Sequence, residues 1–276
     1  MPRSLPPVVL VLAGHDPSGG AGIIADSEAI NASGGWALTV PTALTVQDCH
    51  NVQQVMPVSA HSVLEMVMAL NTLPIAAIKL GLMADIQVLE AVEQVLRRFP
   101  GIPVVADPVL KAGGGTELST AGLSQAYVDK LMPLVDVLTP NREELARLAP
   151  GVTASANDTE RVVTLMERGC GAVLVTATDS PLPESDQQKV VHTLHMPDTT
   201  RQWHWPRLAG QFHGSGCTLA SSLAARLAVG ERLLTACEQA QHFTWQSLSH
   251  GYHPEQGQAL PDRFFNPLFF DTTLLN

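Results

Sequence analysis

The chain has 276 residues, of which 45% are hydrophobic, so it is long and apolar enough to bury a large core. Its formal net charge is −10 and its pI is near 5.4. This balance argues against nucleic acid or an anionic membrane as a partner.

In chain order, the sequence predicts alternating strands and helices. Apolar runs typical of buried strands lie at 8–13, 37–45, 76–80, 104–106, 135–138 and 172–175. Stretches typical of helices lie at 22–32, 61–73, 85–98, 123–134, 160–168 and 219–229. Repeated strand–helix units predict an α/β fold of one domain, with a mostly parallel sheet between two layers of helices. In such sheets ligands bind at the carboxyl ends of the strands.

The segment 178–207 departs from this alternation. A polar stretch with prolines at 179–186 predicts a surface loop, and 190–195 and 200–205 alternate as an antiparallel pair at a sheet edge does. We interpret the histidines here as edge-strand residues rather than metal ligands, because paired carboxylates or cysteines are missing nearby. The tail at 253–276 carries four phenylalanines, and we expect it to pack onto the domain or onto a partner subunit.

The four cysteines, at positions 49, 170, 217 and 237, show no paired spacing, which favours a reducing compartment. The apolar stretch at 8–13 is too short for a signal-peptide core, and no run approaches transmembrane length. We therefore expect a soluble, cytoplasmic protein.

A glycine-rich turn, GHDPSGGAG at 14–22, follows the first strand and opens a helix. It is not a P-loop, because Gly20 stands where the phosphate-binding lysine would be needed. It does not match the dinucleotide fingerprint either. A turn with this much backbone freedom still lets a flat substrate approach the main chain closely.

A second glycine-rich turn, QFHGSGCT at 211–218, precedes the last predicted helix. Such a turn points several free N–H groups at one spot, where the helix dipole adds positive charge, so it suits a phosphate or the transition state of phosphoryl transfer. Cys217 lies in the first helical turn, where the same field favours its thiolate. The alternative is a glycine-rich helix cap with a small buried cysteine behind it.

Six motifs occur in order: GHDPSGGAGIIAD (14–26), PTALTVQD (41–48), IKLGLM (78–83), ADPVL (106–110), LTPNREE (138–144) and HGSGCTLASSLAA (213–225). This set resembles the hydroxymethylpyrimidine and hydroxymethylpyrimidine-phosphate kinases of thiamine biosynthesis, within the ribokinase-like superfamily. The resemblance covers roughly residues 7 to 250. It implies a ribokinase-like fold, ATP and Mg²⁺ as cofactors, and a pyrimidine substrate. We further expect a homodimer.

The resemblance also implies roles for residues around the nucleotide. Cys217 aligns with the catalytic cysteine of the family, where other ribokinase-like enzymes carry an aspartate, and would take the hydroxymethyl proton. Helix capping is the alternative role for Asp107, Glu144 and Asn141. The implied set comprises Gly214, Ser215 and Gly216 for the anion hole, Asp107 and Glu144 for Mg²⁺, and Asn141, Thr176 and Thr218 for ATP.

On the pyrimidine side, Gln47 matches the glutamine that pairs with the aminopyrimidine, since an amide offers both a donor and an acceptor. A glutamine exposed at a strand end, without a ligand, is the alternative. Asp26 matches an acid near the hydroxymethyl group. The apolar walls of the pocket would come from Gly14, Leu82 and Val109.

Three positions depart from the family pattern: His15, Leu82 and Thr176. Leu82 stands in the place of a methionine, a volume-conserving change. Thr176 stands where the family usually has a lysine, which puts phosphate affinity or the second phosphorylation in doubt. A threonine there is more like pyridoxal kinases, so we keep pyridoxal or pyridoxine kinase as one alternative function. A weakly catalytic pyrimidine-binding protein is another.

Overall fold

The computed structural model describes residues 4–111, 115–149, 151–153, 155–178 and 188–265, and within them one nine-stranded sheet runs through the molecule. The strands lie in the order β3-β2-β1-β4-β5-β6-β7-β8-β9. In chain order they are β1 (Val8–His15), β2 (Trp36–Gln47), β3 (Val52–Pro57), β4 (Ile75–Leu80), β5 (Val104–Ala106), β6 (Val137–Leu138), β7 (Ala172–Thr176), β8 (Lys189–Met196) and β9 (Thr199–Pro206).

The inner strands are parallel and the outer ones are antiparallel. Pairs β2–β1, β1–β4, β4–β5, β5–β6 and β6–β7 are parallel, whereas β3 pairs antiparallel with β2, β8 with β7, and β9 with β8. The carboxyl ends of β1, β2 and β4–β7 therefore meet at one edge. The predicted α/β class and antiparallel edge are confirmed.

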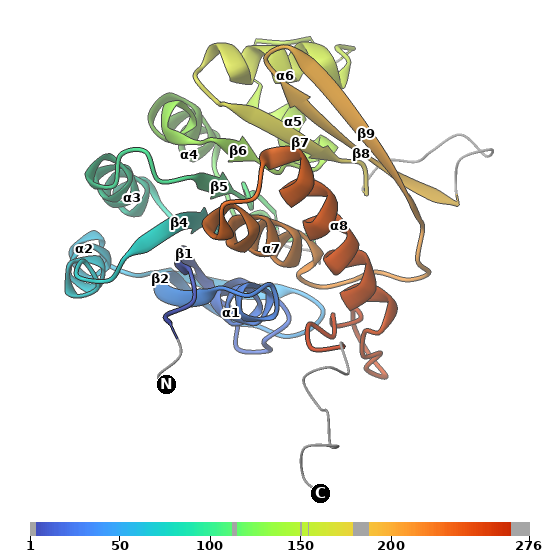
Figure 1. Cartoon of the computed structure of the whole chain (residues 1–276), viewed down its shortest axis with the longest axis horizontal. Coiled ribbons are helices and arrows are strands. Elements are labelled where there is room, and N and C mark those ends of the chain that lie inside the picture. The colour runs from blue at the N-terminus through green and yellow to red at the C-terminus, as the bar shows by residue number, and fades with distance from the viewer. Residues whose placement is uncertain (1–3, 112–114, 150, 154, 179–187, 266–276) are drawn as a thin grey trace, which may run out of the picture.

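Helices cover both faces of this sheet (Figure 1). They are α1 (Gly22–Ala32), α2 (Ala60–Ala69), α3 (Ile86–Arg98), α4 (Ala121–Ala126), α5 (Arg142–Leu148), α6 (Asp158–Glu167), α7 (Ser215–Val229) and α8 (Leu233–Ser249). Helix α7 packs against α1 and α8 on one face, and α2 packs against α3 on the other. None of the helices in the described part of the chain has both the length and the apolar character needed to cross a bilayer.

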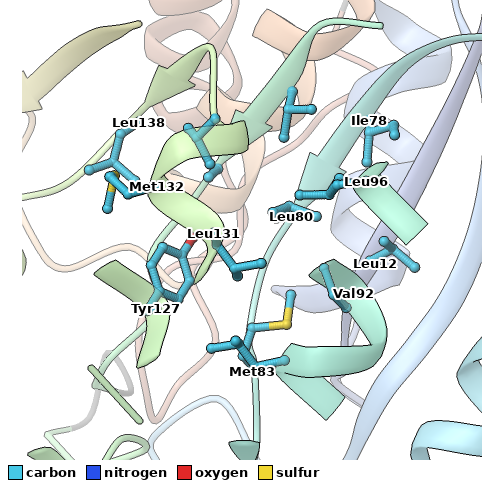
Figure 2. Close-up of a cluster of buried hydrophobic side chains, with 14 of the residues drawn as sticks. Leu12, Ile78, Leu80, Met83, Val92, Leu96, Tyr127, Leu131, Met132 and Leu138 are labelled. Atoms are coloured by element: carbon cyan, nitrogen blue, oxygen red, sulfur yellow. The ribbon is translucent and has the colours of Figure 1, made fainter. Parts of the chain in front are cut away.

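The core is divided in two by β1, because successive side chains of a strand point to opposite faces. Val8, Leu10 and Leu12 belong to the cluster beneath α2 and α3, and Val9 and Val11 belong to the cluster beneath α1 and α7. Figure 2 shows part of the first cluster. Both clusters consist of buried side chains, and they support the sheet from its two faces.

Two segments differ from the predicted elements. The predicted helix at 123–134 is divided into α4, a π-helical turn (Tyr127–Leu131) and a 3₁₀ turn (Met132–Leu134). Pro133 has no N–H to donate, so a regular α-helix cannot continue through it. Strand β3 was not predicted, because its exposed Gln53 and Gln54 give an edge strand a weak apolar pattern.

The chain beyond α8 returns to the domain as far as it is described. Tyr252 pairs with Leu260, Ala259 pairs with Phe212, and the ring of Phe265 stacks on His250. The predicted contact of the tail with the domain therefore holds up to residue 265. The predicted loop at 179–186 and the tail at 266–276 lie outside the described residues.

Candidate active site

A cavity of about 570 Å³ lies at the carboxyl edge of the sheet, a volume typical of small-molecule sites. Most of the residues singled out in the sequence line it. Asp26 and Thr218 are not among the lining residues and are fully buried beside it. Those that do line it are Gly14, His15, Gln47, Leu82, Asp107, Val109, Asn141, Glu144, Thr176, Gly214, Ser215, Gly216 and Cys217.

The two glycine-rich turns lie in direct contact at one side of this cavity. Gly214 is the N-cap of α7 and has φ +77°, and a Cβ on it would overlap the carbonyl oxygen of Gly20. Gly22 has φ +61°, and a Cβ there would overlap the carbonyl oxygen of Gly14. Only glycine combines this backbone conformation with such close approach. The N-termini of α1 and α7 are thereby brought to the same place.

Cys217 lies in the first turn of α7, between charges of both signs. Burial raises the pKa of its thiol to about 12, and the negative charges of Asp26 and Asp107 also act to raise it. The positive charge of Lys79 and the N–H group of Gly22 act in the opposite direction and lower this pKa. Burial therefore opposes the thiolate that the helix dipole favours, and the expected thiolate stays a prediction. The thiol is within hydrogen-bond reach of the Asp107 carboxylate, to which it donates.

Asp107 and Glu144 have the donor chemistry that Mg²⁺ requires. Burial raises the pKa of Asp107, Lys79 lowers it, and Asp26 raises it further, so a cation beside Asp107 would be stabilising. Asp107 also lies next to the anion turn, since a Cβ on Gly216 would be 3.4 Å from its Oδ1. The described residues hold no cluster of three or more metal-ligating side chains. Mg²⁺ does not require one, since it is commonly held by one or two carboxylates with water and phosphates. The two carboxylates therefore fit Mg²⁺.

Asp26 forms a buried ion pair below the cavity. Its Oδ1 accepts hydrogen bonds from Lys79 Nζ at 2.7 Å and from Ser221 Oγ at 2.7 Å. Burial alone would lower the pKa of Lys79, but the charges of Asp26 and Asp107 raise it above its ordinary range. Lys79 lines the cavity and Asp26 does not. Of this pair, therefore, the lysine reaches the cavity and the aspartate lies behind it, and a substrate contact of Asp26 stays a prediction.

Gln47 lies at the end of β2, where Asp16 holds the surrounding groups in place. Asp16 accepts hydrogen bonds from the N–H groups of Ser18 and Ala21, both at 2.8 Å, and from His213 Nε2 at 2.7 Å. The Gln47 amide lies close enough to help lower the pKa of this carboxylate. Burial favours the neutral acid, but these hydrogen bonds, led by that of His213, hold the pKa of Asp16 well below its usual range.

The wall behind the pyrimidine end is apolar and closely packed. A Cβ on Gly14 would lie 3.0 Å from Leu82 Cδ2, so a larger residue at position 14 would crowd the Leu82 side chain. Thr42 Oγ1 donates to the Leu82 carbonyl at 2.5 Å and holds this segment in place. Val109 lines the same cavity.

The other end of the cavity is bounded by α5, β7 and β8. Asn141 caps α5, accepting from the Glu144 N–H at 2.8 Å while Glu144 Oε2 accepts from the Asn141 N–H at 3.0 Å. Asn141 and Glu144 thus do form a helix cap, the alternative weighed for them, and both also line the cavity. The hydroxyl of Thr176 donates to the Pro140 carbonyl at 3.4 Å.

A polar group on β8, β9 and α8 completes this end and was not predicted. Gln241 Oε1 accepts from Trp205 Nε1 at 3.0 Å and from His192 Nδ1, also at 3.0 Å. Burial lowers the pKa of His192 to about 4, so the ring is neutral and Nδ1 carries its hydrogen. All three residues line the cavity. No local motif marks them, since each comes from a different element.

Three residues within recognised motifs were missed. Asp16 and His213 stand in the two glycine-rich turns, and their polar side chains beside glycines were a usable signal. Lys79 stands within an otherwise apolar strand, and a buried lysine almost always requires a charged partner. The family resemblance assigns that partner, Asp26, to the substrate instead.

Solved structures with the same fold are enzymes that act on small molecules. A pyridoxal kinase from Staphylococcus aureus superposes with a TM-score of 0.84 at 23% identity, covering 96% of each chain. A likeness at this identity establishes the shared fold, which is the ribokinase-like architecture expected from the sequence.

Sequence relatives identify the family. A hydroxymethylpyrimidine/phosphomethylpyrimidine kinase of Haemophilus influenzae is 30% identical over 257 residues, covering 91% of this chain and 94% of that protein. A chloroplastic thiamine biosynthetic bifunctional enzyme of Arabidopsis thaliana is 32% identical over 266 residues, covering 94% of this chain. The chain spans only 50% of the length of that bifunctional relative. The family model for phosphomethylpyrimidine kinase matches residues 16–262, and the chain belongs to this family.

Proposed function

We propose that the protein transfers the γ-phosphoryl group of ATP to 4-amino-5-hydroxymethyl-2-methylpyrimidine and to its monophosphate, for thiamine biosynthesis. One observation carries this proposal. A single cavity holds Gln47, which can recognise an aminopyrimidine, together with the anion turn and Cys217 of α7. Family membership supports the same reaction.

In the proposed first reaction, the substrate hydroxyl oxygen attacks the γ-phosphorus, and the bond from that phosphorus to the β-phosphate oxygen breaks, which releases ADP. The N–H groups of Gly214, Ser215 and Gly216 stabilise charge on the transferred phosphoryl group. Cys217 accepts the hydroxyl proton as its own thiol proton moves to Asp107. Mg²⁺ would be held by Glu144 and, through its water ligands, by Asp107, and it would neutralise phosphate charge.

Lys79 and Asp16 support this chemistry by position. The Lys79 ammonium lies beside Cys217 and Asp107 and offsets negative charge there. The Asp16 carboxylate only accepts hydrogen bonds, so it favours a Gln47 amide with its NH₂ group toward Asp16 and its carbonyl oxygen toward the amino group of the pyrimidine. A homodimer and a cytoplasmic location stay predictions.

The experiment that tests this function compares three substrates with one enzyme preparation. ATP consumption is measured with hydroxymethylpyrimidine, its monophosphate and pyridoxal, with and without EDTA. Highest kcat/KM on the pyrimidines, abolished by EDTA, supports the proposal. Highest kcat/KM on pyridoxal would make the protein a pyridoxal kinase, and tight pyrimidine binding without turnover would make it a binding protein.

Replacing Gln47 by leucine tests how the ring is recognised. The Gln47→Leu variant loses the amide that pairs with the aminopyrimidine, which leaves a ring edge unsatisfied and weakens binding by roughly 1–3 kcal/mol. Pyridoxal turnover, where measurable, should fall less. The measurement is kcat/KM for both substrates, with Gln54→Leu on the exposed edge strand β3 as the matched control. Equal losses for both substrates would mean that Gln47 supports the fold rather than reading the ring.

Because of Thr176, we expect the second phosphorylation to be slower than the first. The second reaction brings a substrate phosphate near the charge of ATP, and threonine offers only a hydroxyl where a lysine would supply a positive charge. Thr176→Lys should therefore narrow the gap between the two single-turnover rates. Thr199→Lys, at an exposed position where β9 begins, controls for net charge.

Equal rates in the unaltered enzyme would contradict the Thr176 prediction. Arg207, an exposed arginine that also lines the cavity, would then be the residue to test as the source of positive charge. An Arg207→Ala variant that slows the second step alone would establish that source.

A further inference from the structure

Arg263 is a buried arginine that lies outside the cavity and one residue beyond the part of the chain matched by the family model. It is 3% exposed. Its segment, residues 259–263, is called the C-terminal strap. The strap follows α8 and lies against the segment that leads into the anion turn, with the His213 N–H donating to the Ala259 carbonyl at 2.9 Å.

The guanidinium of Arg263 is bonded to both glycine-rich turns at once. Nη2 donates to the Gly20 carbonyl at 2.5 Å, and Nη1 reaches the Gly19 carbonyl at 3.4 Å. Nε donates to Thr218 Oγ1 at 2.9 Å, and that hydroxyl in turn donates to the Gly214 carbonyl at 2.8 Å. One planar group therefore ties the turn before α1 to the first turn of α7.

These contacts lie where the catalytic geometry is assembled. The carbonyl oxygen of Gly20 that accepts from Arg263 is the same atom that packs on Gly214, the N-cap of α7. Gly19 and Gly22 both have positive φ, so the first turn has wide conformational freedom unless its peptide groups are held from outside. The Gly22 N–H of that turn approaches the sulfur of Cys217.

We propose that Arg263 is a positioning residue that holds the two glycine-rich turns in register, so that the N–H groups of the anion turn and Cys217 point at one reacting centre. It acts through Gly20 and Thr218 and does not touch substrate. The fourth contact, from Nη1 to Glu28 Oε2 at 3.0 Å, joins a partly exposed carboxylate and orients the guanidinium. Because the activity assayed is the proposed one, this inference rests in part on the proposed function.

The test replaces Arg263 by lysine and by alanine. Lysine keeps the charge but cannot span several acceptors in one plane, so it should not substitute for arginine. At a temperature where circular dichroism shows each variant folded, kcat should fall about 10- to 100-fold with the KM values for ATP and pyrimidine nearly unchanged. Millimolar guanidinium should restore part of the kcat of Arg263→Ala. Arg226→Lys, on α7 and paired with Glu231, is the matched control.

A readout that does not need the reaction separates this inference from the proposed function. In Arg263→Lys, amide hydrogen exchange should rise about tenfold or more in peptides covering residues 16–24 and 212–219, and stay unchanged in α3. If lysine prevents folding, Thr218→Val, which removes the link to Gly214 and keeps the bonds to Gly19 and Gly20, carries the same measurement. Unchanged exchange in both turns, or kcat within twofold of the unaltered enzyme, would overturn the inference.

Discussion

Cys217→Ala lowers kcat by about two to four orders of magnitude, the usual span for removal of a general base. The alanine keeps the anion turn intact, because the N–H groups of Gly214, Ser215 and Gly216 belong to the main chain. The KM for ATP should therefore change little. Cys217→Asp should keep partial activity, since an aspartate can also accept the proton, although the nearby Asp26 and Asp107 disfavour a third negative charge. Steady-state kinetics with hydroxymethylpyrimidine measure both variants.

Cys237→Ala provides the control for the loss of a cysteine. Cys237 is buried, lies on α8 and does not line the cavity, so its removal should leave kcat near that of the unaltered enzyme. Near-normal turnover in Cys217→Ala would remove Cys217 from the role of base. The Asp107 carboxylate, within hydrogen-bond reach of the sulfur, would then be the residue that accepts the proton.

The elements that sequence predicted well are those whose signal is local. Helix α3 was expected at 85–98 and is found at Ile86–Arg98, because its apolar residues recur three and four apart and Asp85 caps it through the Val88 N–H at 2.7 Å. Strand β5, at Val104–Ala106, has the predicted bounds. The interrupted helix before β6 and the edge strand β3 were not predicted, because proline geometry and tertiary pairing decide them.

The residues of the candidate site also fall into two groups: those with a local signal in the sequence, and those whose surroundings depend on residues far away in the chain. Glycine-rich turns can be identified from sequence because their backbone conformations require glycine, as the positive φ of Gly214 and Gly22 shows. Asp26 could not be placed from sequence, because its partners Lys79 and Ser221 are 53 and 195 residues away. The pKa of Cys217 depends on its burial and on the charges of Lys79, Asp26 and Asp107, so the direction of its shift could not be deduced from a helix N-terminus alone.

The largest loss of stability is expected from a substitution that breaks the buried ion pair of Lys79 and Asp26. Both side chains are fully buried, so Lys79→Met leaves the Asp26 carboxylate without its cation. Breaking a buried pair in this way costs about 3–5 kcal/mol of unfolding free energy. One oxygen of Asp26, Oδ2, is already buried without a hydrogen-bond partner among the described residues, so no alternative donor is in place. Denaturant unfolding followed by circular dichroism measures the change in midpoint.

A double variant separates loss of the charge from loss of packing. In Lys79→Met with Asp26→Asn, the charge that lacks a partner is gone and the amide oxygen of the new asparagine can still accept from Ser221, so most of the stability should return. Lys130→Met, which removes a surface pair with Glu90, should cost less than about 1 kcal/mol. If the double variant were no more stable than Lys79→Met alone, the loss would come from the packing of the Lys79 stem in the core, and the buried charge would not be its cause.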